Sequence, residues 1–130
     1  MILDSSAIVA ALTREVGGDV FRQAMLDAPS LAISSVTVLE VRMVLHSRYN
    51  AEAVLAFDEM LEQSAIAVVP FDDVMSRVAF DSFCRYGKGQ GHPAQLNIVD
   101  CAAYALAKTR GEPLLFKGND FLRTDILSAI

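Results

Sequence analysis

Short apolar segments alternate with longer helix-forming segments along the whole chain, and this alternation restricts the fold more than any other feature. Strands are predicted at four apolar segments, with a fifth near the carboxyl end as a candidate edge strand: Met1–Leu3, Leu31–Ser34, Ala65–Val69, Leu114–Phe116 and Ile126–Ile130. Helices are predicted between them, at Ser5–Thr13, Asp19–Asp27, a segment opened by Ser34, Ser35 or Thr37 and running through Leu45, Ala51–Gln63, Asp72–Arg85 and Asn97–Thr109. Such alternation is typical of an α/β fold with a mostly parallel central sheet. We therefore expect four to five strands with helices on both faces.

Composition and length indicate one compact unit. The 130 residues are 53% hydrophobic and 21% charged, which supplies one core and predicts a single domain over residues 1–130. The chain contains no run of eighteen apolar residues, so no membrane span is predicted. The amino terminus also lacks the basic region of a signal peptide. A cytoplasmic protein is therefore expected, with Cys84 and Cys101 as buried free thiols.

The net charge of −5 argues against a passive nucleic-acid binder, whose surface is usually basic. It argues less against a metal-dependent nuclease. Such an enzyme needs clustered carboxylates to hold divalent cations, and those cations supply the missing positive charge.

Four carboxylates are expected at one edge of the sheet. Asp4 ends the first strand, Glu40 lies in the opening turns of the helix after the second, Asp100 lies in the first turn of a later helix, and Asp120 follows the last main strand. In open parallel sheets, ligands bind beyond the carboxyl ends of the strands. An unpaired charge among apolar neighbours is costly, and a bound divalent cation would compensate for it.

Each carboxylate also has a purely structural interpretation. Asp4 is a suitable cap for the following helix, and Asp100 a favourable partner for a helix dipole. Glu40 has Arg42 or Arg14 as a candidate ion-pair partner, and Asp120 follows Gly118 and Asn119 as turn aspartates often do.

Four motifs, taken together, resemble one known family. They are MILDSSAIVAAL at the amino terminus, SSVTVLEVRMVL around Glu40, YGKGQGHPAQLNIVDCAAYALAK around Asp100 and LLFKGNDFLRTDI around Asp120. They span the chain in the order seen in PIN-domain ribonucleases, and more narrowly in VapC-type toxins of type II toxin–antitoxin systems. The resemblance implies the PIN-like α/β fold and a magnesium- or manganese-dependent endoribonuclease.

The resemblance also assigns roles to residues. Asp4, Glu40 and Asp100 match the acidic triad that carries catalysis and binds the metal, and Asp120 matches the more variable fourth acidic position. Relatives often carry Thr-x-Asp after that strand, whereas this chain has Phe116–Gly118, which puts direct metal binding by Asp120 in doubt. Ser6 matches a small polar residue that supports the first aspartate.

Three basic residues are candidates for contacting RNA phosphates: Arg85, Lys88 and Lys117. We expect them in two glycine-containing loops near the carboxylates, although solvated loop charge is the simpler interpretation of each. His92, between Gly91 and Pro93, is expected to be structural rather than catalytic.

The resemblance implies partners as well: transfer or ribosomal RNA as substrate, a VapB-like antitoxin that blocks the cleft, and a homodimer. The residues support the protein partners through the apolar faces of Asp19–Asp27 and Ala51–Gln63, which a core would equally explain. Two alternatives stay open, a non-catalytic PIN-like module that binds RNA or a partner, and a structure-specific DNA nuclease. A phosphoacceptor receiver domain fits less well, because the first strand ends in one aspartate only and the Asp72–Asp73 pair falls elsewhere.

Overall fold

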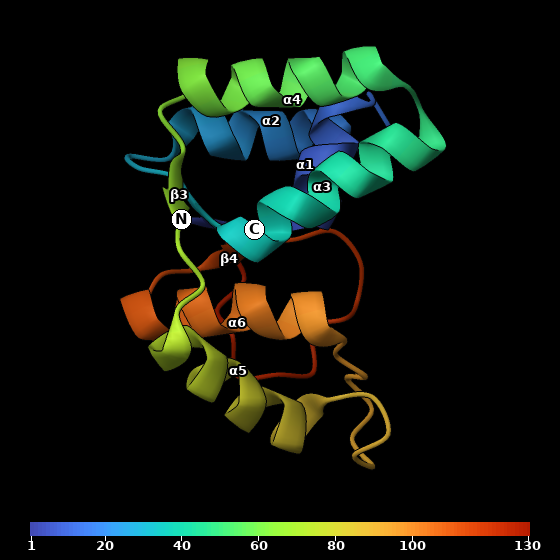
Figure 1. Cartoon of the computed structure of the whole chain (residues 1–130). Coiled ribbons are helices and arrows are strands. Elements are labelled where there is room, and N and C mark those ends of the chain that lie inside the picture. Colours follow the sequence, from blue (N-terminus) through green and yellow to red (C-terminus); the bar gives the residue numbers. More distant parts are fainter.

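A computed structural model describes residues 1–130 and contains a four-stranded sheet (Figure 1). The strands are β1 (Ile2–Leu3), β2 (Ala32–Ser34), β3 (Ala67–Val69) and β4 (Leu114–Leu115). They lie in the order β3-β2-β1-β4 and every pairing is parallel, with Ile2 opposite both Ala32 and Leu114. The predicted parallel α/β fold is confirmed. The candidate edge strand at the carboxyl end is reduced to one bridge between Leu114 and Ser128.

Six helices connect the strands: α1 (Ser5–Leu12), α2 (Gly18–Asp27), α3 (Ser35–Arg48), α4 (Ala51–Gln63), α5 (Asp73–Tyr86) and α6 (Ile98–Arg110). The predicted bounds agree to within a residue, except that α3 continues three residues past Leu45, and several differences arise at caps. Asp72 and Asn97 precede their helices and cap them through side-chain oxygens that accept backbone N–H groups. Ser34 is the residue that caps α3. None of the helices is long and apolar enough to cross a membrane.

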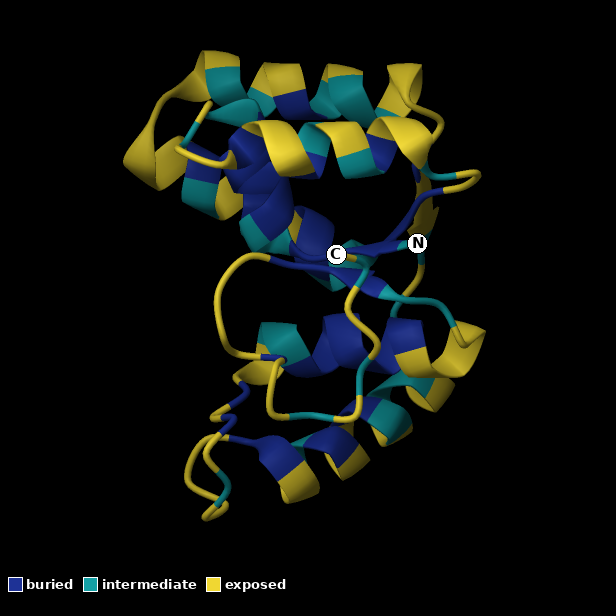
Figure 2. Cartoon of the chain, turned by 180° about the vertical axis from the view of Figure 1, so that it is seen from behind, coloured by how far each residue is buried: buried dark blue, intermediate teal, exposed yellow.

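The sheet separates two hydrophobic cores, visible as dark layers on either side of the strands in Figure 2. Alternate residues of each strand face opposite sides, so Leu3 and Leu115 pack against α1–α4 while Ile2 and Leu114 pack against α5 and α6. All four are fully buried. Apolar residues in such strands therefore serve both cores, which explains why the strands show no polar alternation.

The cysteines are both free, as predicted, but only Cys101 is buried. The prediction of a buried Cys84 is wrong because α5 packs through Ala79, Ser82 and Tyr86, at helical spacing, and Cys84 lies on another face of the helix.

The strand order reverses beside β1. The chain passes from β1 outward to β2 and β3, and then returns to place β4 on the other side of β1. Ligand crevices of open parallel sheets lie at such points, beyond the carboxyl ends of the strands. The residue that follows β1 is Asp4.

Candidate active site

Asp4 is 4% exposed and caps the start of α1. Its Oδ2 atom accepts hydrogen bonds from the backbone N–H and the hydroxyl of Ser6, at 3.0 and 2.5 Å. Its Oδ1 atom is buried and has no hydrogen-bond partner. Burial raises the pKa of Asp4, the bonds from Ser6 oppose that rise, and the charge of Asp120 adds to it. The predicted cap is therefore present, yet half of the carboxylate remains unsatisfied.

Ser6 joins two parts of the site. Its hydroxyl donates to Asp4 and accepts the backbone N–H of Lys117, at 2.9 Å, from the segment that follows β4. The structure thus places Ser6 beside the first aspartate, where it fixes both the carboxylate and the neighbouring loop.

Glu40 lies in the second turn of α3 and is half-buried. Its Oε2 atom is buried without a hydrogen-bond partner. Burial raises the pKa of Glu40, the Ser5 hydroxyl lowers it less, and the charge of Asp4 raises it further. The ion pair considered with Arg42 does not form, because Arg42 binds Asp58 at 2.8 Å instead.

Asp100 is half-buried in the first turn of α6, where it forms a capping box with Asn97. The Oδ2 atom of Asp100 accepts the backbone N–H of Asn97 at 2.9 Å. Burial is the largest cause that raises the pKa of Asp100 to about 7; the Asn97 bond opposes it, and three neighbouring charges, those of Asp4, Asp120 and Glu40, add to the rise.

Asp120 is exposed in the segment after β4. Its charge raises the pKa of both Asp4 and Asp100, and the charges of Asp4 and Glu40 likewise reach Asp100. The structure therefore brings the four sequence-predicted carboxylates within electrostatic reach of one another, from four different segments of the chain.

The four side chains do not close into a complete coordination sphere, since no three His, Cys, Asp or Glu groups converge tightly enough to hold a metal ion by themselves. The donor set nevertheless fits one. Two buried carboxylate oxygens, Oδ1 of Asp4 and Oε2 of Glu40, lack any partner, and buried polar atoms are rarely left so. Magnesium prefers carboxylate oxygens and keeps several waters, so it suits an open carboxylate set better than a closed cage.

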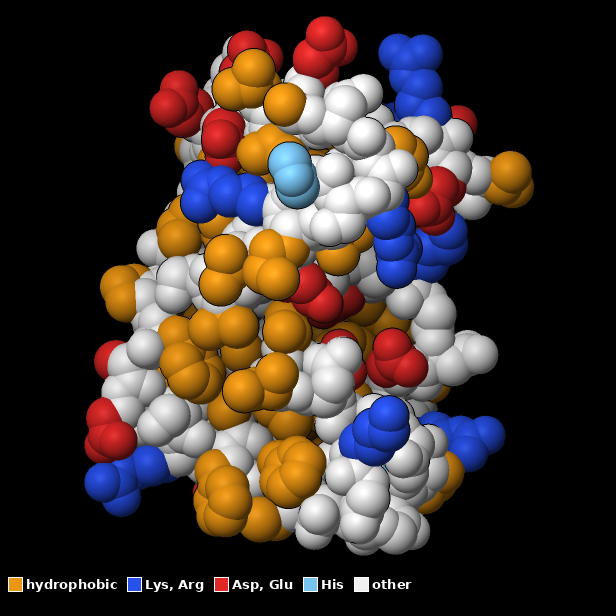
Figure 3. Space-filling model, turned by 45° about the vertical axis from the view of Figure 1, so that its right-hand side comes forward, with side chains coloured by type: hydrophobic (Ala, Val, Ile, Leu, Met, Phe, Trp, Pro, Cys, Tyr) orange, Lys and Arg blue, Asp and Glu red, His pale blue; other side chains and the backbone are white.

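A polar hollow of ≈ 280 Å³ lies against Glu40 on the α1 side, lined also by Ser5, Ser6, Arg48 and Lys117. An apolar hollow of ≈ 410 Å³ lies on its other side, where Leu39, Met43 and Val99 meet. Figure 3 shows acidic side chains at the centre of this face, basic side chains above and below them, and an apolar patch beside them. A larger hollow of ≈ 600 Å³ lies away from the carboxylates, among apolar side chains of α2 and α4, and offers no comparable chemistry.

The three predicted basic residues have different surroundings. Lys117 lines the polar hollow, although it also pairs with Glu15. Lys88 is exposed in the glycine-containing loop. The prediction that Arg85 lies in this loop is wrong, because α5 continues through Tyr86.

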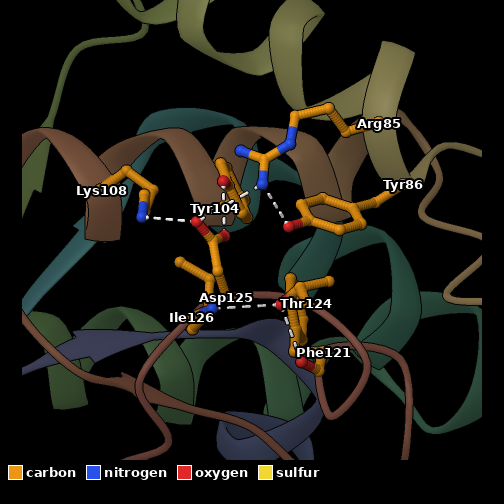
Figure 4. A network of polar contacts seen from close by, with 8 residues as sticks. All are labelled: Arg85, Tyr86, Tyr104, Lys108, Phe121, Thr124, Asp125 and Ile126. Carbon is orange, nitrogen blue, oxygen red and sulfur yellow. Dashed lines mark hydrogen bonds and ion pairs between the residues drawn. The ribbon is translucent and has the colours of Figure 1, made fainter.

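Arg85 takes part in a separate network around Asp125 (Figure 4). Its guanidinium lies 3.7 Å from the Asp125 carboxylate and donates to the Tyr86 hydroxyl at 2.6 Å. Lys108 and Tyr104 donate to the same carboxylate at 2.9 and 2.7 Å. The network attaches the segment after β4 to α6 and gives the Arg85 guanidinium a carboxylate partner within the chain.

Two arginines near the site were missed from sequence. Arg48, at the end of α3, lines both hollows beside Glu40, and Arg123 lines a third hollow together with Asp120. Neither forms an ion pair within the chain. His92 accepts the Ala94 N–H at 3.1 Å and packs edge-on against Tyr86, in agreement with a structural role.

Comparison with known proteins identifies the family. The PIN domain family matches residues 1–127. Ribonuclease VapC42 of Mycobacterium tuberculosis is 40% identical over 129 residues, covering 99% of this chain and 98% of that protein. Ribonuclease VapC28 of the same species is 39% identical over 130 residues, covering 100% and 98%. The crystal structure of M. tuberculosis VapC20, described as a sarcin–ricin loop cleaving toxin, superposes with a TM-score of 0.81 over 97% of this chain and 95% of that one, at 15% identity. This chain therefore belongs to the VapC ribonucleases, the PIN-domain toxins of toxin–antitoxin systems.

Proposed function

We propose that this protein is a magnesium-dependent endoribonuclease whose site is formed by Asp4, Glu40, Asp100 and Asp120. One observation carries the proposal: carboxylate oxygens of Asp4 and Glu40 are buried together without partners beside a third carboxylate whose pKa is raised to about 7. Such a cluster is unfavourable unless a cation neutralises it. Membership of the VapC ribonucleases agrees with this chemistry.

The four carboxylates have distinct proposed tasks. Asp4 and Asp100 bind the cation, because each is fixed by hydrogen bonds to one oxygen at the start of a helix. Glu40, whose buried Oε2 atom has no hydrogen-bond partner, is a ligand or accepts the proton of the attacking water. Asp120 completes the acidic ring from the exposed side. Bound Mg²⁺ or Mn²⁺ supplies Lewis-acid activation of water and neutralises the charge of the phosphate.

Basic side chains of the protein would bind the RNA substrate. Lys117 and Arg48 flank the polar hollow beside Glu40, and we propose that they contact the phosphates on one side of the scissile bond. We propose site-specific cleavage of a transfer or ribosomal RNA, by analogy with the VapC relatives.

Cleavage of RNA by wild type, Asp4→Asn and Asp100→Asn tests the assignment. With Mg²⁺ present, wild type is expected to cut RNA and both variants to lose at least 100-fold in rate. Asp73→Asn is the matched control, because Asp73 is an exposed aspartate of α5 paired only with Arg77. Equal cleavage by wild type and both site variants would contradict the metal site. Cleavage of single-stranded DNA at the same rate would favour the DNA nuclease, and binding without cleavage would favour the non-catalytic module.

We also propose a VapB-like antitoxin as protein partner. The apolar hollow beside Glu40 is bordered by exposed Leu39 and Met43, 58% and 60% exposed, and an inhibitor seated there would obstruct the carboxylates. Addition of the matching antitoxin is expected to stop cleavage by wild type and to have much less effect on Leu39→Asp. Equal inhibition of both proteins would place the antitoxin elsewhere.

A homodimer is proposed in addition. The helices α2 and α4 bury Phe21, Met25 and Phe57 in their own core, while Leu26 and Leu55 stay 79% and 62% exposed. Light scattering of the purified protein is expected to give twice the 14.1 kDa mass of the chain. A monomer at micromolar concentration would contradict this proposal.

A further inference from the structure

A third hollow is lined by Asp120 and shares no lining residue with the two hollows beside Glu40. Its volume is ≈ 540 Å³, within the range of small-ligand sites. One wall is the end of the glycine-containing loop, at Pro93 and Gln95, and the other is the segment after β4, at Asn119 and Leu122. Asp120 lines this hollow, and its charge also acts on the buried carboxylates. The hollow therefore borders the candidate active site at Asp120.

The lining combines three kinds of group. Gln95 and Asn119 present amides, each with donors and an acceptor, and Leu122 is an apolar surface that is 61% exposed. Arg123 contributes a guanidinium that pairs with no carboxylate of the chain. Amides read the hydrogen-bonding edges of bases, apolar side chains contact their faces, and arginine binds phosphate.

Both walls are held in place by the fold. The Gln95 amide donates to the His92 carbonyl at 2.6 Å, which fixes its direction and leaves its own carbonyl oxygen as an acceptor. Phe121 packs against Phe116 with ring centres 5.2 Å apart. Asp125 anchors the end of the same segment to α6 (Figure 4). A preformed pocket discriminates between ligands at a smaller entropic cost than a mobile one.

We propose that this hollow binds the nucleoside next to the scissile phosphate and selects the position of the cut in RNA. Asn119 and Gln95 hydrogen-bond to the base edge, and Leu122 contacts the base face. Arg123 binds the adjoining phosphate. The inference rests on the proposed function, because a strand whose phosphate lies at the carboxylates brings a neighbouring nucleoside within reach of the hollow that Asp120 lines. Of the three hollows lined by Glu40 or Asp120, this one combines amides, an apolar surface and an unpaired cation.

Cleavage of RNA oligonucleotides randomised around one position, followed by sequencing of the cut ends, tests the inference. Wild type is expected to prefer one base next to the cut. Asn119→Ala and Gln95→Asn are expected to weaken that preference about 5- to 100-fold, the discrimination that a base-edge contact provides. Asparagine is chosen at Gln95 because the backbone there has φ 57°, which asparagine tolerates.

Arg123→Ala is expected to slow cleavage of all sequences alike, because a phosphate contact carries no base information. The matched control for Arg123 is Arg77→Ala, because Arg77 is an arginine on α5 that is 78% exposed. The control for the amide variants is Gln90→Ala, because Gln90 lies in the same loop as Gln95 but outside the hollow. Both controls are expected to match wild type in rate and preference.

The outcomes separate the two proposals. Absence of cleavage by wild type would overturn the proposed function. Cleavage with the same base preference in wild type, Asn119→Ala and Gln95→Asn would overturn the inference and leave the function intact. Unchanged preference combined with loss of antitoxin inhibition in Asn119→Ala would assign the hollow to a protein partner, and so would also overturn it.

Discussion

Replacement of Asp100 by asparagine isolates the cost of keeping a carboxylate in this site. The Asp100 carboxyl has a pKa of about 7, against an ordinary value of 3.8, mainly because it is buried. In the wild-type protein the Asn97 N–H donates to Oδ2 of Asp100 at 2.9 Å. Asparagine retains a side-chain oxygen that can accept this bond, so the cap of α6 is kept while the charge is removed. The variant therefore tests electrostatics with little change in packing.

The magnitude follows from the two pKa values. Their difference, 7 − 3.8, corresponds to about 4 kcal/mol at about 1.4 kcal/mol for each pKa unit. Partial contact with solvent screens the charge and reduces this to about 2 kcal/mol. The folded protein keeps the Asp100 proton up to about pH 7, whereas the unfolded chain releases it near pH 4, so this group lowers the free energy of unfolding as pH rises between those values.

Urea denaturation in the presence of EDTA measures the effect. At pH 8 the Asp100→Asn protein is expected to be about 2 kcal/mol more stable than wild type, with a smaller difference at pH 5. Addition of Mg²⁺ is expected to stabilise wild type and to stabilise the variant much less. A stability difference that is equal at pH 5 and pH 8, or a variant less stable than wild type at pH 8, would refute the reasoning.

Three further changes give independent tests. Ser6→Ala removes the hydroxyl that donates to Asp4, and the Mg²⁺ concentration for half-maximal cleavage is expected to rise about 10- to 100-fold, with Ser6→Thr close to wild type. Tyr104→Phe removes the hydrogen bond to Asp125 and is expected to lower the free energy of unfolding by about 1 kcal/mol in urea denaturation. This is less than a hydrogen bond to a buried charged group contributes, because the Asp125 side chain is 39% exposed. Phe57→Ala is expected to lower the free energy of unfolding by about 3–5 kcal/mol in the same assay, because the Phe57 side chain on α4 is fully buried in the core. An unchanged urea transition would contradict the packing described for that side of the sheet.

The fold and the positions of the carboxylates along it were predictable because their signals are local. The strand at Ile2 and Leu3 is apolar on both faces, and the aspartate that ends it falls where parallel sheets bind ligands. The helix start at Asn97 places Asp100 in a first turn, and the structure reproduces both features. These expectations depend on a few adjacent residues and on the regularity of parallel sheets.

The cations were less predictable because their surroundings are set by residues distant in sequence. Arg85 looked like a free loop charge, but α5 runs one residue further and Asp125 approaches from the carboxyl end. Arg48 lies at the end of a helix whose direction relative to the carboxylates depends on packing across the core. The sequence shows that a basic residue is present, but its ion-pair partner is known only from the folded structure.

The structural and functional interpretations of the aspartates turn out to be compatible. Asp4 uses Oδ2 to hold the start of α1 and leaves Oδ1 buried without a partner, and Asp100 uses Oδ2 to cap α6 while its pKa rises to about 7. Capping fixes the direction of each carboxylate, and burial of the charged group destabilises the metal-free fold. A cation that neutralises the cluster removes part of this cost, so its affinity and the stability of the fold are linked. Evidence that such an aspartate caps a helix therefore does not weaken the case that it binds metal, since the cap is what holds the remaining oxygen in place.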